Sequence, residues 1–279
     1  MKTAALFDID NTLTPPRQPI TESMVQILDC LCVPFHVAAG SHLPLLMQQF
    51  FEPLYQFGYR KQFDAFLSNG AIHYRCDFSA DISIEVISSF NICHHLGESN
   101  YKFLIETLKK TQMLPEFQLS LPIKIIGETI VFRDSMVNFA PIGRVQLEGA
   151  EVQLNRKNFV EYDQSTGYRQ RVMEYLNYEL SPLVENNDLK ITLGGQTSFD
   201  IGILGKDKTN AVTTLFNLGF KRIVFFGDAL FEGGNDAAIR ELAEAWPSTS
   251  QQSIETVQVD SYKETIEKLY EFNFLKKLI

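Results

Sequence analysis

The stretch LFDIDNTLT, residues 6–14, places two aspartates one residue apart directly after an apolar run. The run TAALF (3–7) is typical of a short strand that is covered on both faces of a parallel sheet. Side chains at positions i and i+2 of an extended chain point the same way, so Asp8 and Asp10 are expected to project together from the carboxyl end of this strand. Open α/β sheets bind their ligands at that end, so the stretch predicts a site with two carboxylates.

Two carboxylates held this close repel each other unless a cation lies between them or one of them keeps its proton. Both arrangements are chemically useful, and an oxygen-only cluster suits Mg²⁺. The spacing alone leaves a plainer interpretation open, in which the pair only ends a strand and turns the chain. The rest of the sequence has to decide between the two.

The two ends of the chain share one pattern. Apolar runs at 34–39 (PFHVAA) and 221–227 (KRIVFFG) resemble the first run and are also expected as parallel strands. Helix-like stretches lie between them, at 21–31, 42–51 and 207–218. This alternation of strands and helices predicts a doubly wound parallel α/β sheet.

The middle of the chain has a different pattern. Helices are expected at 79–96, 98–111 and 168–180, and strands within 119–143, 190–195 and 198–204. Helices followed by paired strands predict an antiparallel α+β unit inserted into the α/β one. The expected division gives residues 1–82 and 204–279 to the core and residues 83–203 to the inserted cap.

Composition disfavours several classes of partner. The 279 residues carry a formal net charge of -9, which argues against broad binding to nucleic acid or to an anionic membrane. No apolar run reaches the ~18 residues of a membrane span. The four cysteines have no metal-type spacing, and no export signal is visible at the start, so reduced thiols and a cytoplasmic protein are expected.

Three later motifs favour the functional interpretation. Ser41 in AAGSH is expected at a helix start, where a hydroxyl and backbone N–H groups bind phosphate oxygens, although serine also caps helices without a ligand. GKDKT offers Lys206 or Lys208 at another helix start, a position where lysine gains nothing from the helix dipole and better serves a ligand. VFFGDALFEGGND ends an apolar strand with a second group of polar side chains, namely Asp228, Asn235 and Asp236.

This order of motifs, Asp-x-Asp-x-Thr, then Ser, then Lys, then Gly-Asp with a further Asp, resembles the haloacid dehalogenase superfamily of phosphotransferases. The resemblance implies that Asp8 is the nucleophile that accepts a phosphoryl group, Asp10 the general acid/base and Thr12 a residue that steadies the loop. Ser41 and Lys208 would hold phosphoryl oxygens. The implied ligands of Mg²⁺ are Asp8, the main-chain carbonyl of Asp10, Asp228, Asn235 and Asp236.

Over nearly its full length the chain is similar to the eukaryotic phosphomannomutases, through FDIDNTLTPPRQ (7–18), FRDSMVNFAPIGR (132–144), GGQTSFDI (194–201) and FFGDALFEGGND (225–236). Two of these segments lie in the expected cap. The resemblance implies that the substrate is bound by Arg17, Arg133, Arg144, Arg156, Ser198 and Asp200. Arg156 is assigned across a short insertion, from the match of RKNFVEYD (156–163).

The residue types of the cap suit this role. Arg133 and Arg144 flank a strand-turn-strand stretch, and the rigid fork of a guanidinium matches a phosphate in two hydrogen bonds, so the pair is expected to form an anion clamp. The alternative is that both are surface arginines paired with local carboxylates. A second phosphate site favours a mutase, because a bisphosphate intermediate must be held at one end while the other end reacts.

The resemblance therefore implies a Mg²⁺-dependent conversion of mannose 6-phosphate to mannose 1-phosphate, primed by a hexose 1,6-bisphosphate, in a homodimer formed through the cap. Two other interpretations are kept: a sugar-phosphate phosphatase with the same aspartyl phosphate, and a catalytically idle binding protein. Asn11 stands where the family usually has glycine, and it tolerates a left-handed backbone nearly as well. His42 stands where the family usually has an acidic residue, which bears on the balance between mutase and phosphatase.

Overall fold

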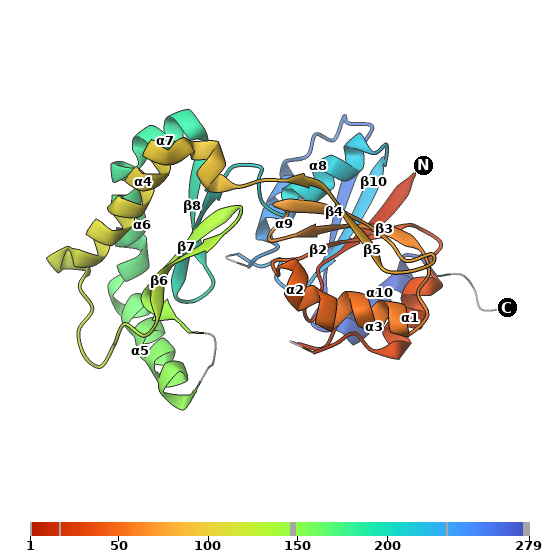
Figure 1. Ribbon diagram of the computed structural model, residues 1–279, viewed down its shortest axis with the longest axis horizontal. Coiled ribbons are helices and arrows are strands. Elements are labelled where there is room, and N and C mark those ends of the chain that lie inside the picture. Colours follow the sequence, from red (N-terminus) through yellow and green to blue (C-terminus); the bar gives the residue numbers. More distant parts are fainter. Residues whose placement is uncertain (1, 17, 146–148, 233, 276–279) are drawn as a thin grey trace. The chain divides into compact units, whose positions relative to one another are not determined.

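The computed structural model describes residues 2–16, 18–145, 149–232 and 234–275, and the chain divides into two compact units (Figure 1). The core unit comprises Met1–Ser89 and Gly205–Ile279, and the inserted unit comprises Phe90–Leu204. The sequence placed the start of the insertion at residue 83. Strand β5 (Ser83–Ser89) pairs with β4 (Ile72–Asp77) of the core sheet, so the inserted unit begins after β5.

The core unit is built on a seven-stranded sheet in the order β11-β10-β1-β2-β3-β4-β5. The bounds of the other strands are β1 Thr3–Phe7, β2 Phe35–Ala38, β3 Gln62–Leu67, β10 Arg222–Gly227 and β11 Ser253–Gln258. The first five strands in this order are parallel, and β4 and β5 are added antiparallel at one edge. This arrangement confirms the parallel α/β core that the sequence predicts.

Helices cover both faces of the core sheet. Their bounds are α1 Glu22–Asp29, α2 Leu43–Leu46, the π-helical η1 Met47–Phe51, α3 Glu52–Gln56, α8 Thr209–Asn217, α9 Ala237–Ala245 and α10 Tyr262–Glu271. Phe7 of β1 belongs to an apolar cluster with side chains of α1, α3 and α10, whereas Leu6 belongs to a second cluster with side chains of α8 and α9. Successive residues of β1 thus face different layers, which is why the strand is apolar throughout.

The expected helix over 79–96 is wrong in its first half. Residues 83–89 form β5, and helix α4 (Ile92–Met113) begins only after it. Ile82, Ile84 and Val86 recur at every second position, which is the period of a strand, and β-branched side chains favour that structure. Gly97, with φ of 74°, interrupts α4 at the boundary that the sequence predicts between two helices.

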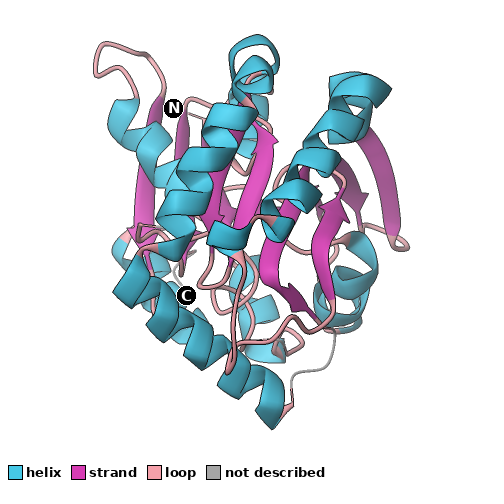
Figure 2. Cartoon of the chain, turned by 90° about the vertical axis from the view of Figure 1, so that its left-hand side faces the viewer, coloured by secondary structure: helices cyan, strands magenta, loops and turns pink. Residues whose placement is uncertain are grey.

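The inserted unit has an antiparallel sheet in the order β6-β7-β9-β8. Its elements are α4, η2 Pro115–Phe117, β6 Glu128–Arg133, β7 Met136–Arg144, α5 Ala150–Thr166, α6 Tyr168–Glu179, α7 Ser181–Asn187, β8 Leu189–Gly194 and β9 Ser198–Ile203. One apolar cluster joins Phe139 and Phe199 of the sheet to Leu108, Phe159 and Val172 of the helices, so the helices cover one face of the sheet (Figure 2). This confirms the α+β insertion. Among the described residues, no helix is both long and apolar enough to cross a bilayer.

Candidate active site

Asp8 follows β1 directly, at the carboxyl end of the parallel strands. Its backbone N–H donates to the carbonyl of Phe226 at 2.9 Å, so the pairing of β1 with β10 continues to this residue. Phe7 and Ile9 on either side are buried, and Asp8 itself is 3% exposed. The fold therefore holds a carboxylate in a nearly dry environment at the edge where α/β proteins bind ligands.

Lys208 is the lysine that the structure brings to Asp8, which decides between Lys206 and Lys208. Its Nζ donates to Asp8 Oδ1 at 2.5 Å and to Asp236 Oδ1 at 2.6 Å, and the residue is 1% exposed. A buried ammonium group is tolerated only when carboxylates compensate its lost hydration, and two of them do so here. Burial alone would lower the pKa of Lys208, but Asp236 and Asp8 outweigh it and raise that pKa above its usual value.

Close packing places Lys208 in this position. Gly70, with φ of 81°, lies in the turn between β3 and β4, and a Cβ added to it would lie 2.3 Å from the carbonyl oxygen of Asp207. Only glycine allows this approach. The Asp207 side chain accepts from the amide of Thr209 at 2.9 Å and so satisfies the start of α8, while Asn210 Nδ2 donates to the Gly70 carbonyl at 2.8 Å.

Three carboxylates meet at this point. Ligand oxygens of Asp8, Asp228 and Asp236 lie within 4.8 Å of one another. Asp236 is fully buried, and its Oδ2 accepts from the amide of Ala229 at 3.3 Å. A Cβ added to Gly227 would lie 2.5 Å from Asp236 Oδ2, so the glycine of the Gly-Asp motif makes room for this carboxylate.

The surroundings raise the pKa values of Asp8 and Asp228. Burial is the main cause that raises the pKa of Asp8 to about 7; the Lys208 ammonium opposes this shift, and Asp236 adds to it. Burial also raises the pKa of Asp228, which a hydrogen bond from Asn11 opposes. In the described part of the chain, three carboxylates share one ammonium group here, which leaves the cluster short of positive charge.

Asp10 lies in the loop that follows Asp8. Strand β1 ends at Phe7, and the amides of residues 12–14 all donate to the carbonyl of Ile9, which forms a turn. Asp10 is exposed and is not one of the three carboxylates of the cluster, but its charge is among the causes that raise the pKa of Asp228. That Asp8 and Asp10 project together stays a prediction.

Thr12 connects this loop to helix α10. Its carbonyl accepts from the hydroxyl of Thr265 at 2.7 Å, and both residues are fully buried. The Thr12 hydroxyl itself is buried and has no hydrogen-bond partner in the described part of the chain. Arg17, expected to reach the substrate from just beyond this loop, lies outside the described residues.

Ser41 and Asn235 come from neighbouring loops of the core unit. Helix α2 begins at Leu43 with His42 in the cap position, so Ser41 precedes the cap and does not start the helix as predicted. The Ser41 carbonyl accepts from the amide of Ser68, in the turn that packs against Lys208. Asn235 is exposed, and a Cβ added to Gly40 would lie 4.0 Å from its Nδ2.

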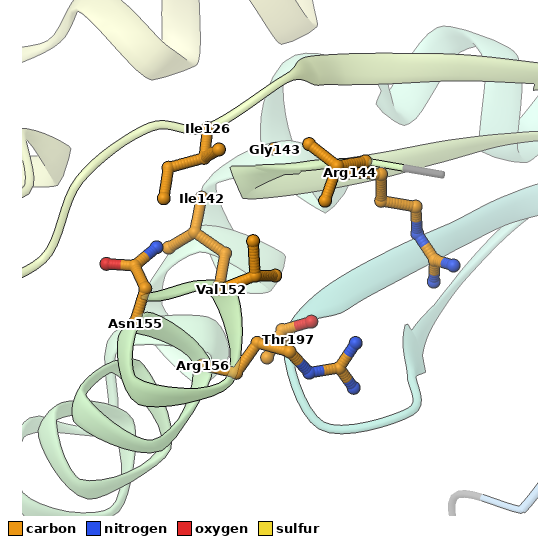
Figure 3. A pocket seen from close by; sticks show the side chains of 9 residues that line it. Ile126, Ile142, Gly143, Arg144, Val152, Asn155, Arg156 and Thr197 are labelled. Atoms are coloured by element: carbon orange, nitrogen blue, oxygen red, sulfur yellow. The ribbon is translucent and has the colours of Figure 1, made fainter. Parts of the chain in front are cut away.

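Arg144 and Arg156 line a pocket within the inserted unit. Figure 3 shows both side chains, one from the end of β7 and one from α5, extending to the same side of this pocket. Its volume is about 60 Å³, several times the roughly 10–15 Å³ that one water needs. Two guanidinium groups beside such a space suit an anion with several oxygens, such as a phosphate.

Arg133 does not line this pocket. It pairs with Met136, the first residue of β7, whereas Arg144 is the last residue of β7. At roughly 3.4 Å per residue, most of the length of the strand separates the two arginines. The pair therefore does not form the predicted clamp, and Arg156 is the arginine beside Arg144.

Asn138 is a site residue that the sequence analysis missed. Its Nδ2 donates to Ser198 Oγ at 3.1 Å and to Asp200 Oδ1 at 2.5 Å, so Ser198 and Asp200 lie on one face of β9, as predicted. Arg144 Nη2 also donates to Ser198 Oγ, at 3.2 Å, which joins this group to the arginine pocket. The signal was present in the sequence, because Asn138 is a polar residue in an apolar strand and is fully buried.

Comparison with known proteins identifies the family. The model of a family described as eukaryotic phosphomannomutase matches residues 32–271. Phosphomannomutase 2 of Dictyostelium discoideum is 33% identical over 240 residues, which cover 85% of this chain and 86% of that protein. The phosphomannomutase of Spinacia oleracea is 34% identical over 239 residues, which cover 84% and 85%. The chain belongs to the eukaryotic phosphomannomutase family.

Membership of the phosphomannomutase family confirms the prediction from the motifs, and with it the expectation of an enzyme. The family match begins at residue 32, so it is independent of the loop that follows Asp8. An N-terminally truncated, IMP-bound IMP-nucleotidase of Plasmodium falciparum aligns over 98% of this chain and 68% of that chain, with a TM-score of 0.59 and 13% identity. This likeness concerns the fold, and it agrees with the fold class that the sequence predicts.

The acidic cluster of this phosphomannomutase family member fits a divalent cation. Asp8, Asp228 and Asp236 offer oxygen atoms only, which is the ligand type that Mg²⁺ prefers. Burial first, and then the neighbouring carboxylates, raise the pKa values of Asp8 and Asp228, and Lys208 is the one lysine that the described residues bring to compensate their charge. The donor set thus suits the cation that the motifs imply.

Proposed function

We propose that the protein is a Mg²⁺-dependent phosphomannomutase that interconverts mannose 6-phosphate and mannose 1-phosphate through a hexose 1,6-bisphosphate. One observation carries the proposal: each unit has its own group of side chains suited to a phosphate. The core unit has the cluster of Asp8 and Lys208, and the inserted unit has the pocket of Arg144 and Arg156. A mutase needs two such groups, because one phosphate of the bisphosphate is held while the other reacts.

In the proposed reaction, a carboxylate oxygen of Asp8 attacks the phosphorus atom and forms an aspartyl phosphate, while the bond from phosphorus to the sugar oxygen breaks. Asp10 gives its proton to that sugar oxygen, and it takes a proton from the attacking hydroxyl when the phosphoryl group returns to the sugar. The exposure of Asp10 supports this role, because the group that exchanges protons with a sugar must be accessible to it.

The remaining core residues would hold the reacting groups. Asp8, Asp228, Asp236, Asn235 and the carbonyl of Asp10 would bind Mg²⁺, which supplies the positive charge that lets a carboxylate approach a phosphate. Lys208 and Ser41 would bind phosphoryl oxygens. Thr12 would keep the loop in place through its hydrogen bond with Thr265 of α10.

In the inserted unit, Arg144 and Arg156 would bind the phosphate that is not reacting. Ser198 and Asp200, both bonded to Asn138, would bind sugar hydroxyls. Arg133 and Arg17 would make further contacts with the substrate. We also propose a cytoplasmic homodimer formed through the inserted unit. Light scattering on the purified protein tests whether the chain is a dimer.

Phosphorus NMR of the purified chain with mannose 1-phosphate, Mg²⁺ and a trace of mannose 1,6-bisphosphate tests the function. The expected result is the appearance of mannose 6-phosphate, at a rate that depends on the bisphosphate. Release of inorganic phosphate without bisphosphate would instead identify a sugar-phosphate phosphatase that uses the same nucleophile.

The matched control is Asp8→Asn, which keeps the size of the side chain and removes the nucleophile. This variant is expected to lose at least about 10³-fold in turnover, because no other side chain takes over the attack. Equal turnover by the wild type and the variant would overturn the proposed mechanism.

A further inference from the structure

Asn11 connects three loops of the core unit. Its Nδ2 donates to Asp228 Oδ2 at 3.1 Å and to the backbone carbonyl of Asp260 at 3.2 Å. Asn11 lies in the loop after β1, Asp228 follows β10, and Asp260 follows β11. One side-chain amide group therefore joins the ends of three adjacent parallel strands.

Asparagine suits both the two hydrogen bonds and the backbone conformation at position 11. The amide NH₂ carries two N–H bonds, one for each acceptor. Asn11 has φ of 61°, in the left-handed region where asparagine is among the few side chains that are tolerated. Glycine would accept the same backbone but would lose both hydrogen bonds.

The second acceptor is itself held in place. The amide of Asp260 donates to Glu264 Oε2 at 2.7 Å, and Ser261 caps helix α10 by accepting from the amide of Glu264 at 3.4 Å. The Asp260 carbonyl is therefore anchored to the start of a helix. Because Asn11 donates to both the Asp260 carbonyl and Asp228 Oδ2, it links the carboxylate of Asp228 to this helix start.

We propose that Asn11 is a positioning residue of the cation site. It occupies Oδ2 of Asp228 and leaves the other oxygen of this carboxylate for a divalent cation shared with Asp8 and Asp236. Hydrogen bonds that orient a metal-binding carboxylate raise the affinity of the site for its metal. The inference rests on the Mg²⁺ site of the proposed function and adds a residue that the family pattern does not supply.

Isothermal titration calorimetry with Mg²⁺ on the EDTA-treated full chain tests the inference without any measurement of activity. Asn11→Gly is expected to weaken Mg²⁺ binding about tenfold, because Asp228 loses its fixed orientation. Asn273→Gly is the matched control: it makes the same substitution at a left-handed position, φ of 56°, in the same unit. The control is expected to bind Mg²⁺ as the wild type does.

Two outcomes overturn the inference, and they differ in what they say of the proposed function. Wild-type affinity in Asn11→Gly, together with lost binding in Asp228→Asn, would overturn the role of Asn11 alone. Absence of saturable binding by the wild type would remove the cation site itself. In ¹⁵N-labelled wild type, which needs no variant to fold, Mg²⁺ should shift the side-chain amide signal of Asn11 more than that of Asn273, and equal shifts would count against the inference.

Discussion

The two proposed phosphate sites are built in opposite ways. In the core cluster Asp8, Lys208 and Asp236 are buried, at 3%, 1% and 0% exposed, and Lys208 donates a hydrogen bond to each aspartate. In the inserted unit, Arg144 is exposed and Arg156 is partly exposed, beside a pocket that has room for an anion. One site is assembled as part of the fold, and the other presents charge to solvent.

This difference follows from the cost of burying charge. A buried ion needs a partner in the folded protein, so removal of the cation from the core cluster should change stability as well as chemistry. An exposed arginine keeps most of its hydration and contributes little to stability, so its effect is on binding. Substitutions in the two sites should therefore change different measured quantities.

The largest effect is expected for Lys208→Met. The substitution leaves Asp8 and Asp236 buried without their cation, which should lower the free energy of unfolding by about 3–5 kcal/mol. Urea denaturation followed by circular dichroism measures this change. Lys206→Met is the control, because Lys206 is exposed and a surface change of this kind stays within about 0.5 kcal/mol. Equal stability of both variants would contradict the contrast between a buried and an exposed site.

A smaller effect, on binding, is expected for Arg144→Gln. Loss of charged hydrogen bonds to the non-reacting phosphate should raise KM for mannose 1-phosphate roughly 10- to 100-fold, with little change in stability. Arg133→Gln should raise KM by no more than about threefold, because the substrate contact proposed for Arg133 lies outside the pocket of Arg144 and Arg156. Steady-state kinetics on both variants measures KM for mannose 1-phosphate. An equal rise in KM would show that both arginines bind the same phosphate.

The smallest expected effect, when taken per pH unit, concerns pH. The pKa of Asp8 is raised to about 7, so below that pH a cation must displace a proton from this carboxyl group. Mg²⁺ affinity should therefore fall up to about tenfold per pH unit below pH 7 and level off above it. Calorimetry between pH 5 and 8 measures how Mg²⁺ affinity changes with pH. An affinity that is independent of pH would show that Mg²⁺ does not displace a proton from Asp8.

Much of the fold was accessible from local patterns. The continuous apolar runs at 3–7 and 221–227 predicted buried parallel strands, and the structure forms them as β1 and β10 and pairs them in parallel. Strand β5 was missed because its alternation is short and its residues are largely exposed, which leaves a weak apolar signal. Helix α5 was also missed, since it has few apolar residues and is held by the buried Phe159 and Asn155.

The sequence predicted which residues belong to the site better than it predicted how they are arranged in space. Asp8, Lys208, Asp228 and Asp236 were named from the sequence, and the structure brings them together. The pairing of Arg133 with Arg144 was wrong, because Arg133 lies beside the turn that precedes β7 and Arg144 lies at the far end of β7. The roles of Asn11 and Asn138 depend on partners at least sixty residues away in the chain, which no local pattern indicates.

By itself, the sequence determined which acids and bases this protein has and that the first strand ends in a carboxylate, since strand period and apolar burial are local properties. Tertiary structure decided which of these groups meet. Lys208 reaches Asp8 across 200 positions of the chain, and Arg156 rather than Arg133 joins Arg144. The reason is physical: a charge is stabilised by whatever lies beside it in space, and folding alone brings distant segments together.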